Sequence, residues 1–271
     1  MADAPRVTND VDWQTLPFGV EIEFVGARLG DIHLPEGWDW RDEDALYDEA
    51  GQPVPELVAP DVRGGEVGSP ILTWARRDEI AEVTRQLRAA GGVANWSCGV
   101  HIHVSIEPWG KRLLLPLLDA VLATEDALRG LLQPAPHRAV YTPCTTPAMR
   151  DMLLRATTPE LFETDFVYGD EPWSQRGGVN LRAWADYGTV EFRLPNGSLD
   201  EGEISQTVKL CLKWVTAVGG GETLPTTPDA LADALGVPRT GYPPPQTAPD
   251  WWPARLAWHI EQERANLRGE G

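Results

Sequence analysis

Three separated segments place acidic and basic side chains on one face of a predicted strand. They are 19–24 (GVEIEF), 99–106 (GVHIHVSI) and 189–194 (TVEFRL). Because successive side chains of a strand point to opposite faces, the apolar residues of each segment face a core. The opposite faces carry Glu21 and Glu23, His101 and His103, and Glu191 and Arg193. Carboxylates, imidazoles and guanidinium groups hold metal ions and phosphate groups, so these strands predict a site for both.

Glu21 and Glu23 form a pair of carboxylates on one strand face. Alternate strand residues are about 7 Å apart, and carboxylates at that distance repel each other unless a cation lies between them. Mg²⁺ or Mn²⁺ is the natural cation, because hard divalent ions prefer carboxylate oxygens and keep positions for phosphate groups. The alternative interpretation is an exposed strand with two solvated glutamates.

The segment around His101 and His103 offers several potential ligands close together. Imidazole binds zinc, manganese or iron, and it also donates a hydrogen bond to phosphate. The spacing of His101, His103 and Glu107 fits a metal motif of cupin barrels, although Pro108 follows directly and no later strand supplies a further histidine. A structural histidine beside an exposed one is the non-functional alternative.

Two predicted strands, 178–185 and 188–195, form a hairpin that turns at Asp186-Tyr187-Gly188. Alternation puts Asn180, Arg182 and Trp184 on one face of the first strand. Two arginines, Arg182 and Arg193, on a polar face can clamp a phosphoryl group, because guanidinium forks match phosphate oxygens. The alternative for Arg193 is a structural ion pair with Glu191.

Composition limits the class of protein. The 271 residues are 42% apolar with 12 Trp, which indicates a globular chain with a large core. A net charge of −18 makes attraction to nucleic acid or an anionic membrane unfavourable. Three cysteines without a C-x-x-C pair, no apolar leader at the N-terminus and no membrane-spanning stretch predict a cytoplasmic protein.

The remaining patterns predict the elements that position these residues. Strands are expected at 18–27, 62–68 and 96–106, and an acidic hairpin or mobile flap at 28–60. Apolar periodicity and capping residues predict helices at 75–90, 109–132, 201–218, 227–236 and 252–267. Ser198 or Asp200 caps the third of these helices, with Glu203 placed for a capping box. Antiparallel strands interleaved with helices predict an α+β fold whose sheet has one helix-covered face and one polar face.

Four motifs in this order resemble the amidoligase family of carboxylate–amine ligases, relatives of glutamate–cysteine ligase and glutamine synthetase. They are GVEIEF at 19–24, EVGSP at 66–70, CGVHIHV at 98–104 and TVEFRLPNGSLD at 189–200. The resemblance implies a twisted, funnel-like antiparallel sheet that holds ATP and metal ions on its concave face, with helices on the outer face. It implies metal ligation by Glu21, Glu23, Glu66 and Glu191, with His101 or His103 assisting and His101 the preferred one. It also implies phosphate or acyl-phosphate contacts from Arg182 and Arg193.

The favoured function is an ATP-dependent ligase that joins a small-molecule or peptide carboxylate to an amine through an acyl phosphate, using Mg²⁺ or Mn²⁺. His103, Arg182 and Arg193 are its candidate catalytic residues, and Arg182, Arg193 and His101 are candidates for holding ATP. One alternative is a metal-dependent hydrolase or cupin-like oxygenase built on His101, His103 and Glu107. Another is an inactive relative that binds a nucleotide or peptide. The predicted organisation is a tail (1–17), a catalytic domain (18–218), a Gly/Pro-rich linker (219–250) and a C-terminal helix (251–271).

Overall fold

The computed structural model describes residues 11–43, 46–48, 51, 62–155 and 177–257. One six-stranded sheet runs through it in the order β2-β3-β1-β4-β6-β5, and every neighbouring pair is antiparallel. The strands are β1 (Phe18–Arg28), β2 (Asp39–Arg41), β3 (Val62–Gly68), β4 (Val100–Ser105), β5 (Val179–Asn180) and β6 (Thr189–Phe192). The predicted α+β class is confirmed, and β1 and β4 form the centre of the sheet.

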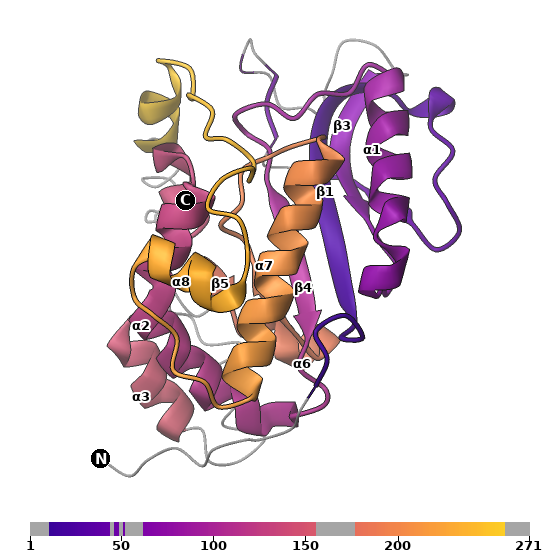
Figure 1. Ribbon diagram of the computed structural model, residues 1–271. Coiled ribbons are helices and arrows are strands. Elements are labelled where there is room, and N and C mark those ends of the chain that lie inside the picture. The colour runs from indigo at the N-terminus through magenta and orange to yellow at the C-terminus, as the bar shows by residue number, and fades with distance from the viewer. Residues whose placement is uncertain (1–10, 44–45, 49–50, 52–61, 156–176, 258–271) are drawn as a thin grey trace.

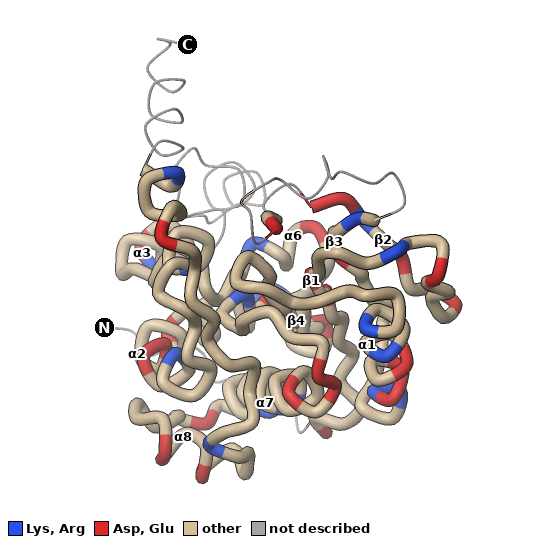
Figure 2. Tube along the Cα trace, turned by 90° about the horizontal axis from the view of Figure 1, so that it is seen from above, with Lys and Arg blue, Asp and Glu red and all other residues tan. Residues whose placement is uncertain are grey.

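Helices cover one face of this sheet. Figure 1 shows α1 (Asp78–Ala89) and α7 (Glu201–Gly219) crossing in front of the strands. The view from above in Figure 2 places α8 (Pro228–Leu235) on the same side and α6 (Ala183–Tyr187) on the opposite side. The described chain also contains α2 (Leu114–Leu132), α3 (Pro147–Arg155) and short 3-10 turns at Leu29–Asp31, Trp74–Arg76, Gly110–Leu113 and Pro136–Val140.

The core lies between the sheet and these helices. Val20, Ile22 and Phe24 of β1 are almost fully buried, and the matching apolar residues of β4 and β6 join them. Ile80, Val83 and Leu87, spaced three and four apart on α1, pack into the same cluster. Each such side chain contributes about 1.5–3 kcal/mol when it is removed from water. This burial fixes the register of the central strands, because a slip by one residue would move their charged side chains into the core.

Local signals set the ends of α7 and α8. The Asp200 carboxylate accepts the backbone N–H groups of Gly202 and Glu203 at the start of α7, while Ser198 donates its hydroxyl proton to Glu203 at 2.5 Å. Pro228 begins α8, and Gly236 with φ +58° ends it. The predicted helices at 75–90, 201–218 and 227–236 are therefore present. The helix predicted from 109 begins as a 3-10 turn and becomes α-helical at Leu114.

The hairpin predicted for 178–195 is wrong in its first arm. β5 is only two residues long, although Asn180 is the register partner of Glu191 as an antiparallel pair requires. The Asn180 side chain then accepts the backbone N–H of Arg182 at 3.0 Å, which turns the chain out of the strand. Residues 183–187 form α6, and Gly188 ends it with φ +68°. Arg182 therefore precedes a helix, and it does not share a strand face with Asn180 and Trp184.

The segments beyond α7 pack onto the rest of the chain. Leu231 and Leu235 of α8 belong to the main core cluster. Farther along, Trp252 lies in a separate aromatic cluster with Tyr47 and Trp96, at ring-centroid distances of 5.5 and 5.1 Å. Residues 252–257 are helical, and the rest of the helix predicted to 267 lies outside the described residues, as do parts of the predicted flap. Within the described chain, no helix has the length and apolar character to cross a membrane.

Candidate active site

The strand register brings the predicted polar residues together on the face away from the helices. Glu21 is the partner of His101 across β1 and β4, and His103 is the partner of Glu191 across β4 and β6. Glu23 is the partner of Glu66 across β1 and β3. Four strands thus contribute to one cluster of four carboxylates and two imidazoles.

His101 lies at the centre of this cluster and exposes only 4% of its surface. Its Nδ1 is 3.3 Å from Glu21 Oε2 and 3.8 Å from Glu191 Oε1, and its Nε2 is 3.6 Å from Glu23 Oε1. Two sets of potential metal ligands share this histidine, and the ligand atoms of each set lie within 4.8 Å of one another. The sets are Glu21, His101 and Glu191, and Glu23, Glu66 and His101.

His103 borders the same cluster. Its Nε2 is 3.5 Å from Glu21 Oε2, and its Nδ1 is 3.1 Å from the hydroxyl of Thr189. Burial lowers the pKa of His103, but the hydrogen bond that His103 donates to Glu21 and the charge of Glu191 outweigh burial, so that the pKa is raised overall. His103 therefore carries a proton more readily than a free histidine does.

Glu191 is held by two donors on the sheet. Arg193 Nη1 lies 2.5 Å from Glu191 Oε1, and the Asn180 amide donates to Oε2 at 2.7 Å. Burial raises the pKa of Glu191, but the charges of Arg193 and the two histidines lower it by more than burial raises it. The net shift of the pKa is therefore downward. The predicted pairing of Glu191 with Arg193 is present, and it keeps this buried carboxylate ionised.

The carboxylates of the cluster divide into two electrostatic states. Burial raises the pKa of Glu21, but hydrogen bonds from both histidines reverse this, so that its pKa falls well below the ordinary value. Burial, together with the charges of Glu21 and Glu23, raises the pKa of Glu66 to about 9. Without a cation the cluster therefore holds more acid groups than it can ionise. This excess of buried oxygen ligands fits a hard divalent cation such as Mg²⁺ or Mn²⁺.

Two cavities open beside the cluster. One of about 250 Å³ is bordered by acidic residues of the cluster together with Ser97, Arg138, Tyr141 and Arg193. The other, of about 310 Å³, lies on the far side of Glu21 and is more apolar, with Pro17, Pro70, Ile71 and Tyr187 in its walls. Glu21 borders both cavities. The acidic cluster therefore lies between a charged space and an apolar one.

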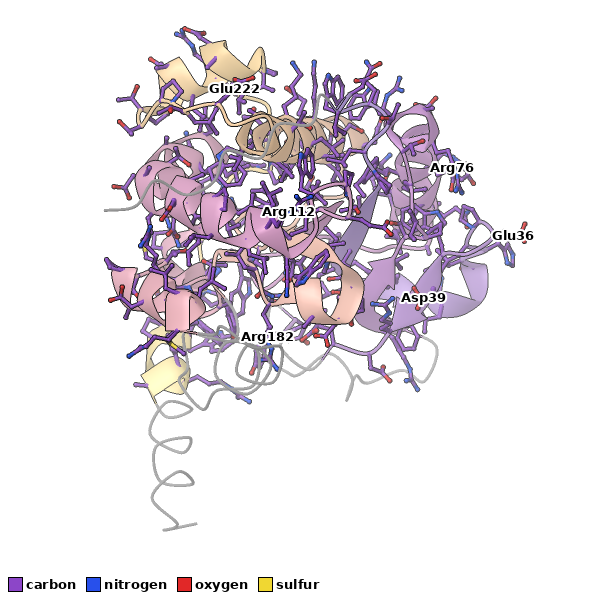
Figure 3. All side chains as sticks on the ribbon, turned by 90° about the horizontal axis from the view of Figure 1, so that it is seen from below. Glu36, Asp39, Arg76, Arg112, Arg182 and Glu222 are labelled. Atoms are coloured by element: carbon purple, nitrogen blue, oxygen red, sulfur yellow. The ribbon has the colours of Figure 1, made fainter. Side chains whose placement is uncertain are left out.

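Two candidates from the sequence, Glu107 and Arg182, lie outside the acidic cluster and do not border the charged cavity. Glu107 is exposed after the end of β4 and borders the apolar cavity. Among the described residues it is in neither set of potential metal ligands, which disfavours the cupin-like alternative. Arg182, labelled in Figure 3, precedes α6 and is not among the residues that border the charged cavity.

The structure adds two arginines that sequence patterns did not single out. Arg41 of β2 reaches Glu21 at 3.4 Å and Glu66 at 3.8 Å, and about half of its side chain is exposed. Arg138 lies in the 3-10 turn Pro136–Val140 and exposes 4% of its surface. The stretch around Arg138 is Pro-rich and has neither strand nor helix periodicity. No signal in the sequence connects it with the strands.

Comparison with protein families bears on this site. A family model described as "Putative amidoligase enzyme" matches residues 39–215, well over half of the chain. The match includes Glu66, His101 and Glu191 and begins after β1, which carries Glu21 and Glu23. A search of curated proteins gives no significant match. Three of the four motifs lie within the matched residues, and the chain belongs to this amidoligase family.

Proposed function

We propose that this protein is an ATP-dependent ligase that joins a carboxylate to an amine and releases ADP and phosphate. The observation that carries the proposal is the buried cluster around His101, in which two sets of potential ligands lie next to a cavity bordered by Arg193. Such an enzyme needs a place for cations and for a transferring phosphoryl group side by side. Membership of the amidoligase family supports the same chemistry.

The acidic cluster is the candidate site for Mg²⁺ or Mn²⁺. Glu21, Glu23, Glu66 and Glu191 supply oxygen ligands and His101 supplies a nitrogen ligand. A divalent ion held by these residues would supply positive charge to neutralise the nucleotide phosphates and the transferring group. The raised pKa of Glu66 supports this assignment, because a cation replaces the proton that the carboxylate otherwise keeps.

The reaction follows from the weakness of a carboxylate as an electrophile. An oxygen of the substrate carboxylate attacks the γ-phosphorus of ATP, and the bond between that phosphorus and the β,γ-bridging oxygen breaks. ADP leaves with the electron pair, and an acyl phosphate forms. The amine nitrogen then attacks the acyl carbon, phosphate leaves, and the nitrogen loses a proton to give the amide.

The residues of the chain take distinct parts in this sequence. Arg193 is the candidate for contacts to the phosphoryl group, since a guanidinium fork matches its oxygens and Glu191 fixes its position. Arg182 is a second candidate, from the start of α6. His103, as the neutral imidazole, is assigned to receive the proton that the amine nitrogen loses. His101 and both arginines are the candidates for contacts with ATP.

The shape of the fold is part of the same proposal. We infer that the open antiparallel sheet forms the wall of a funnel of the glutamine synthetase and glutamate–cysteine ligase type, with ATP on its polar face. Helices on the apolar face and the acidic cluster on the opposite face support this arrangement. The substrates are a small-molecule or peptide carboxylate and an amine.

The direct test is to incubate the protein with ATP, Mg²⁺ and pools of carboxylic acids and amines. ADP release and the masses of new products are measured together. The proposal expects ADP and an amide in equal amounts, and no product without ATP or after chelation of Mg²⁺. The matched control is Glu107→Gln, which leaves both ligand sets intact. Amide formation that consumes no nucleotide would contradict the proposal.

A further inference from the structure

Arg138 is held rigidly at the edge of the charged cavity. Its Nη1 donates to the carbonyl oxygen of Cys98 at 2.7 Å, and its Nη2 donates to the carbonyl oxygen of Arg193 at 3.3 Å. These two carbonyls belong to the segment that leads into β4 and to the residue that follows β6. The guanidinium group therefore joins the segments that flank the adjacent strands β4 and β6.

Gly99 makes room for this guanidinium group. A Cβ atom at Gly99 would lie 2.4 Å from Arg138 Nη2, closer than non-bonded atoms approach. The backbone N–H of Gly99 also donates to Glu23 Oε2 at 2.5 Å. The same glycine thus brings the backbone against both the acidic cluster and Arg138.

Arg138 forms no ion pair in the described chain, although the charge of Glu23 acts on it from a longer distance. No carboxylate there lies within 4.0 Å of its guanidinium nitrogens, whereas Arg193 is paired with Glu191. The Nε atoms of both Arg138 and Arg193 are buried without a hydrogen-bond partner among the described residues. Burial of a charge without an adjacent counter-ion is unfavourable. An anion beside these arginines would offset that cost once a cation neutralises Glu21, Glu23, Glu43 and Glu66, which border the same cavity.

We propose that Arg138 and Arg193 form an oxyanion subsite in the charged cavity. The ligand is a phosphoryl group or the carboxylate that accepts it, which present the same oxygen chemistry to a guanidinium group. Tyr141 also borders this cavity and is a candidate to donate its hydroxyl group to the same anion, whereas the Ser97 hydroxyl already donates to Asn95 at 2.7 Å. The inference rests on the proposed ligase function, and it makes Arg138 a binding residue for the reacting groups.

The test uses inorganic phosphate and acetate as probes, in the presence of Mg²⁺ and without ATP. Binding is measured by calorimetry and by the rise in unfolding temperature of the full chain. We expect phosphate to bind the unmodified protein and Arg138→Met to weaken that binding by about 10- to 100-fold, as loss of hydrogen bonds to a charged group does. Arg138→Lys should weaken it less, because lysine keeps the charge and loses the fork.

Arg129→Met is the matched control. Arg129 is also partly buried and donates to a backbone carbonyl, that of Thr142, but its charge is paired with Glu125. The control should unfold at a lower temperature and keep the response to phosphate. An equal loss of the phosphate response in both variants would overturn the proposal. The loss would then follow from a missing hydrogen bond to a backbone carbonyl and not from a missing contact with the anion. If Arg138→Met does not fold, unchanged phosphate affinity in Arg138→Lys overturns it as well.

The probes separate the remaining outcomes. A rise in unfolding temperature with acetate that depends on Arg138 identifies the subsite as the place of the substrate carboxylate. A rise with phosphate that depends on Arg138 identifies it as the place of the phosphoryl group. Failure of both probes to bind the unmodified protein contradicts the subsite. The binding test contains no ATP and is therefore separate from the assay of amide formation. If the protein forms amide but binds neither probe, the ligase proposal stands and only the subsite is contradicted. Anion binding by Arg138 without any ligation would contradict only the ligase.

Discussion

Glu23 and Glu66 are direct register partners across β1 and β3, and each exposes only 7% of its surface. Burial, followed by the charges of Glu21 and Glu23, raises the pKa of Glu66 to about 9. A sheet that keeps such a pair needs a proton or a cation between its strands. The relationship therefore links the stability of the fold to the occupancy of the site.

The first prediction concerns the pH dependence of stability without metal. A carboxyl group whose pKa is raised on folding stabilises the folded state fully below its unfolded pKa, near 4.5, and this contribution is lost as the pH rises through about 9. His103, whose pKa is also raised, acts in the same direction. The unfolding temperature of the chelator-treated protein should therefore fall between pH 5 and pH 9.

Calorimetric unfolding scans at several pH values test this relationship. Excess Mg²⁺ should flatten the profile, because the cation replaces the proton on Glu66. The Glu66→Gln variant should show a shallower fall than the unmodified protein when both are free of metal. A fall that is equally steep in this variant would exclude Glu66 as its main source.

The second prediction is that the carboxylates of Glu21, Glu23 and Glu191 all take part in binding the divalent cation. Glu21→Gln, Glu23→Gln and Glu191→Gln should each remove Mg²⁺-dependent nucleotide binding, because each replaces a charged oxygen ligand by an amide. Titration of the nucleotide with and without Mg²⁺ measures this. Glu107→Gln is the control and should bind as the unmodified protein does. Unchanged nucleotide affinity in all three variants would contradict the assignment.

The third prediction concerns Arg193. Arg193→Lys should slow ligation by about 10- to 1,000-fold, since lysine retains the charge and loses the bidentate fork that matches phosphoryl oxygens. The unfolding temperature reports separately on the lost contact with Glu191. Steady-state turnover with saturating substrates measures the effect. Full turnover in this variant would return Arg193 to a purely structural ion pair.

The fourth prediction tests the start of α7, which supports the sheet from the opposite face. Asp200→Ala should lower the free energy of unfolding by about 1 kcal/mol, because two backbone N–H groups lose their acceptor. Denaturant titration measures the difference. Asp200→Asn should restore most of the stability, since asparagine also caps a helix. If Asp200→Asn lowers the free energy of unfolding as much as Asp200→Ala does, the charge of Asp200 and not its capping hydrogen bonds is responsible.

Much of the site could be predicted because its residues lie on regular strands. Alternation places Glu21, His101 and Glu191 on one face, and the observed register makes them neighbours. Glu66 is different: only the family resemblance drew attention to it, since its glycine-rich strand has no clear alternation. Its burial against Glu23 depends on pairing between strands about forty residues apart in the sequence, and no local pattern contains that information.

Other features escaped sequence reasoning for physical reasons. α6 replaces a predicted strand because the Asn180 side chain turns the chain and alanine-containing residues continue as a helix. The polar residues Asn180 and Arg182 alternate with apolar ones as in a strand, but the segment is too short for this pattern to distinguish a strand from a turn followed by a short helix. Arg138 reaches the site through hydrogen bonds to the carbonyls of Cys98 and Arg193, which are long-range contacts from an irregular segment.

The central claim is that ATP activates a carboxylate by phosphoryl transfer at this site, and oxygen-18 in the carboxylate tests it most directly. Once a substrate pair is found, labelled carboxylate, unlabelled ATP and the amine are incubated with the protein, and phosphate, nucleotide and amide are examined by mass spectrometry. The account predicts one labelled oxygen in inorganic phosphate, with ADP and amide in equal amounts. Label in AMP with release of pyrophosphate would contradict it.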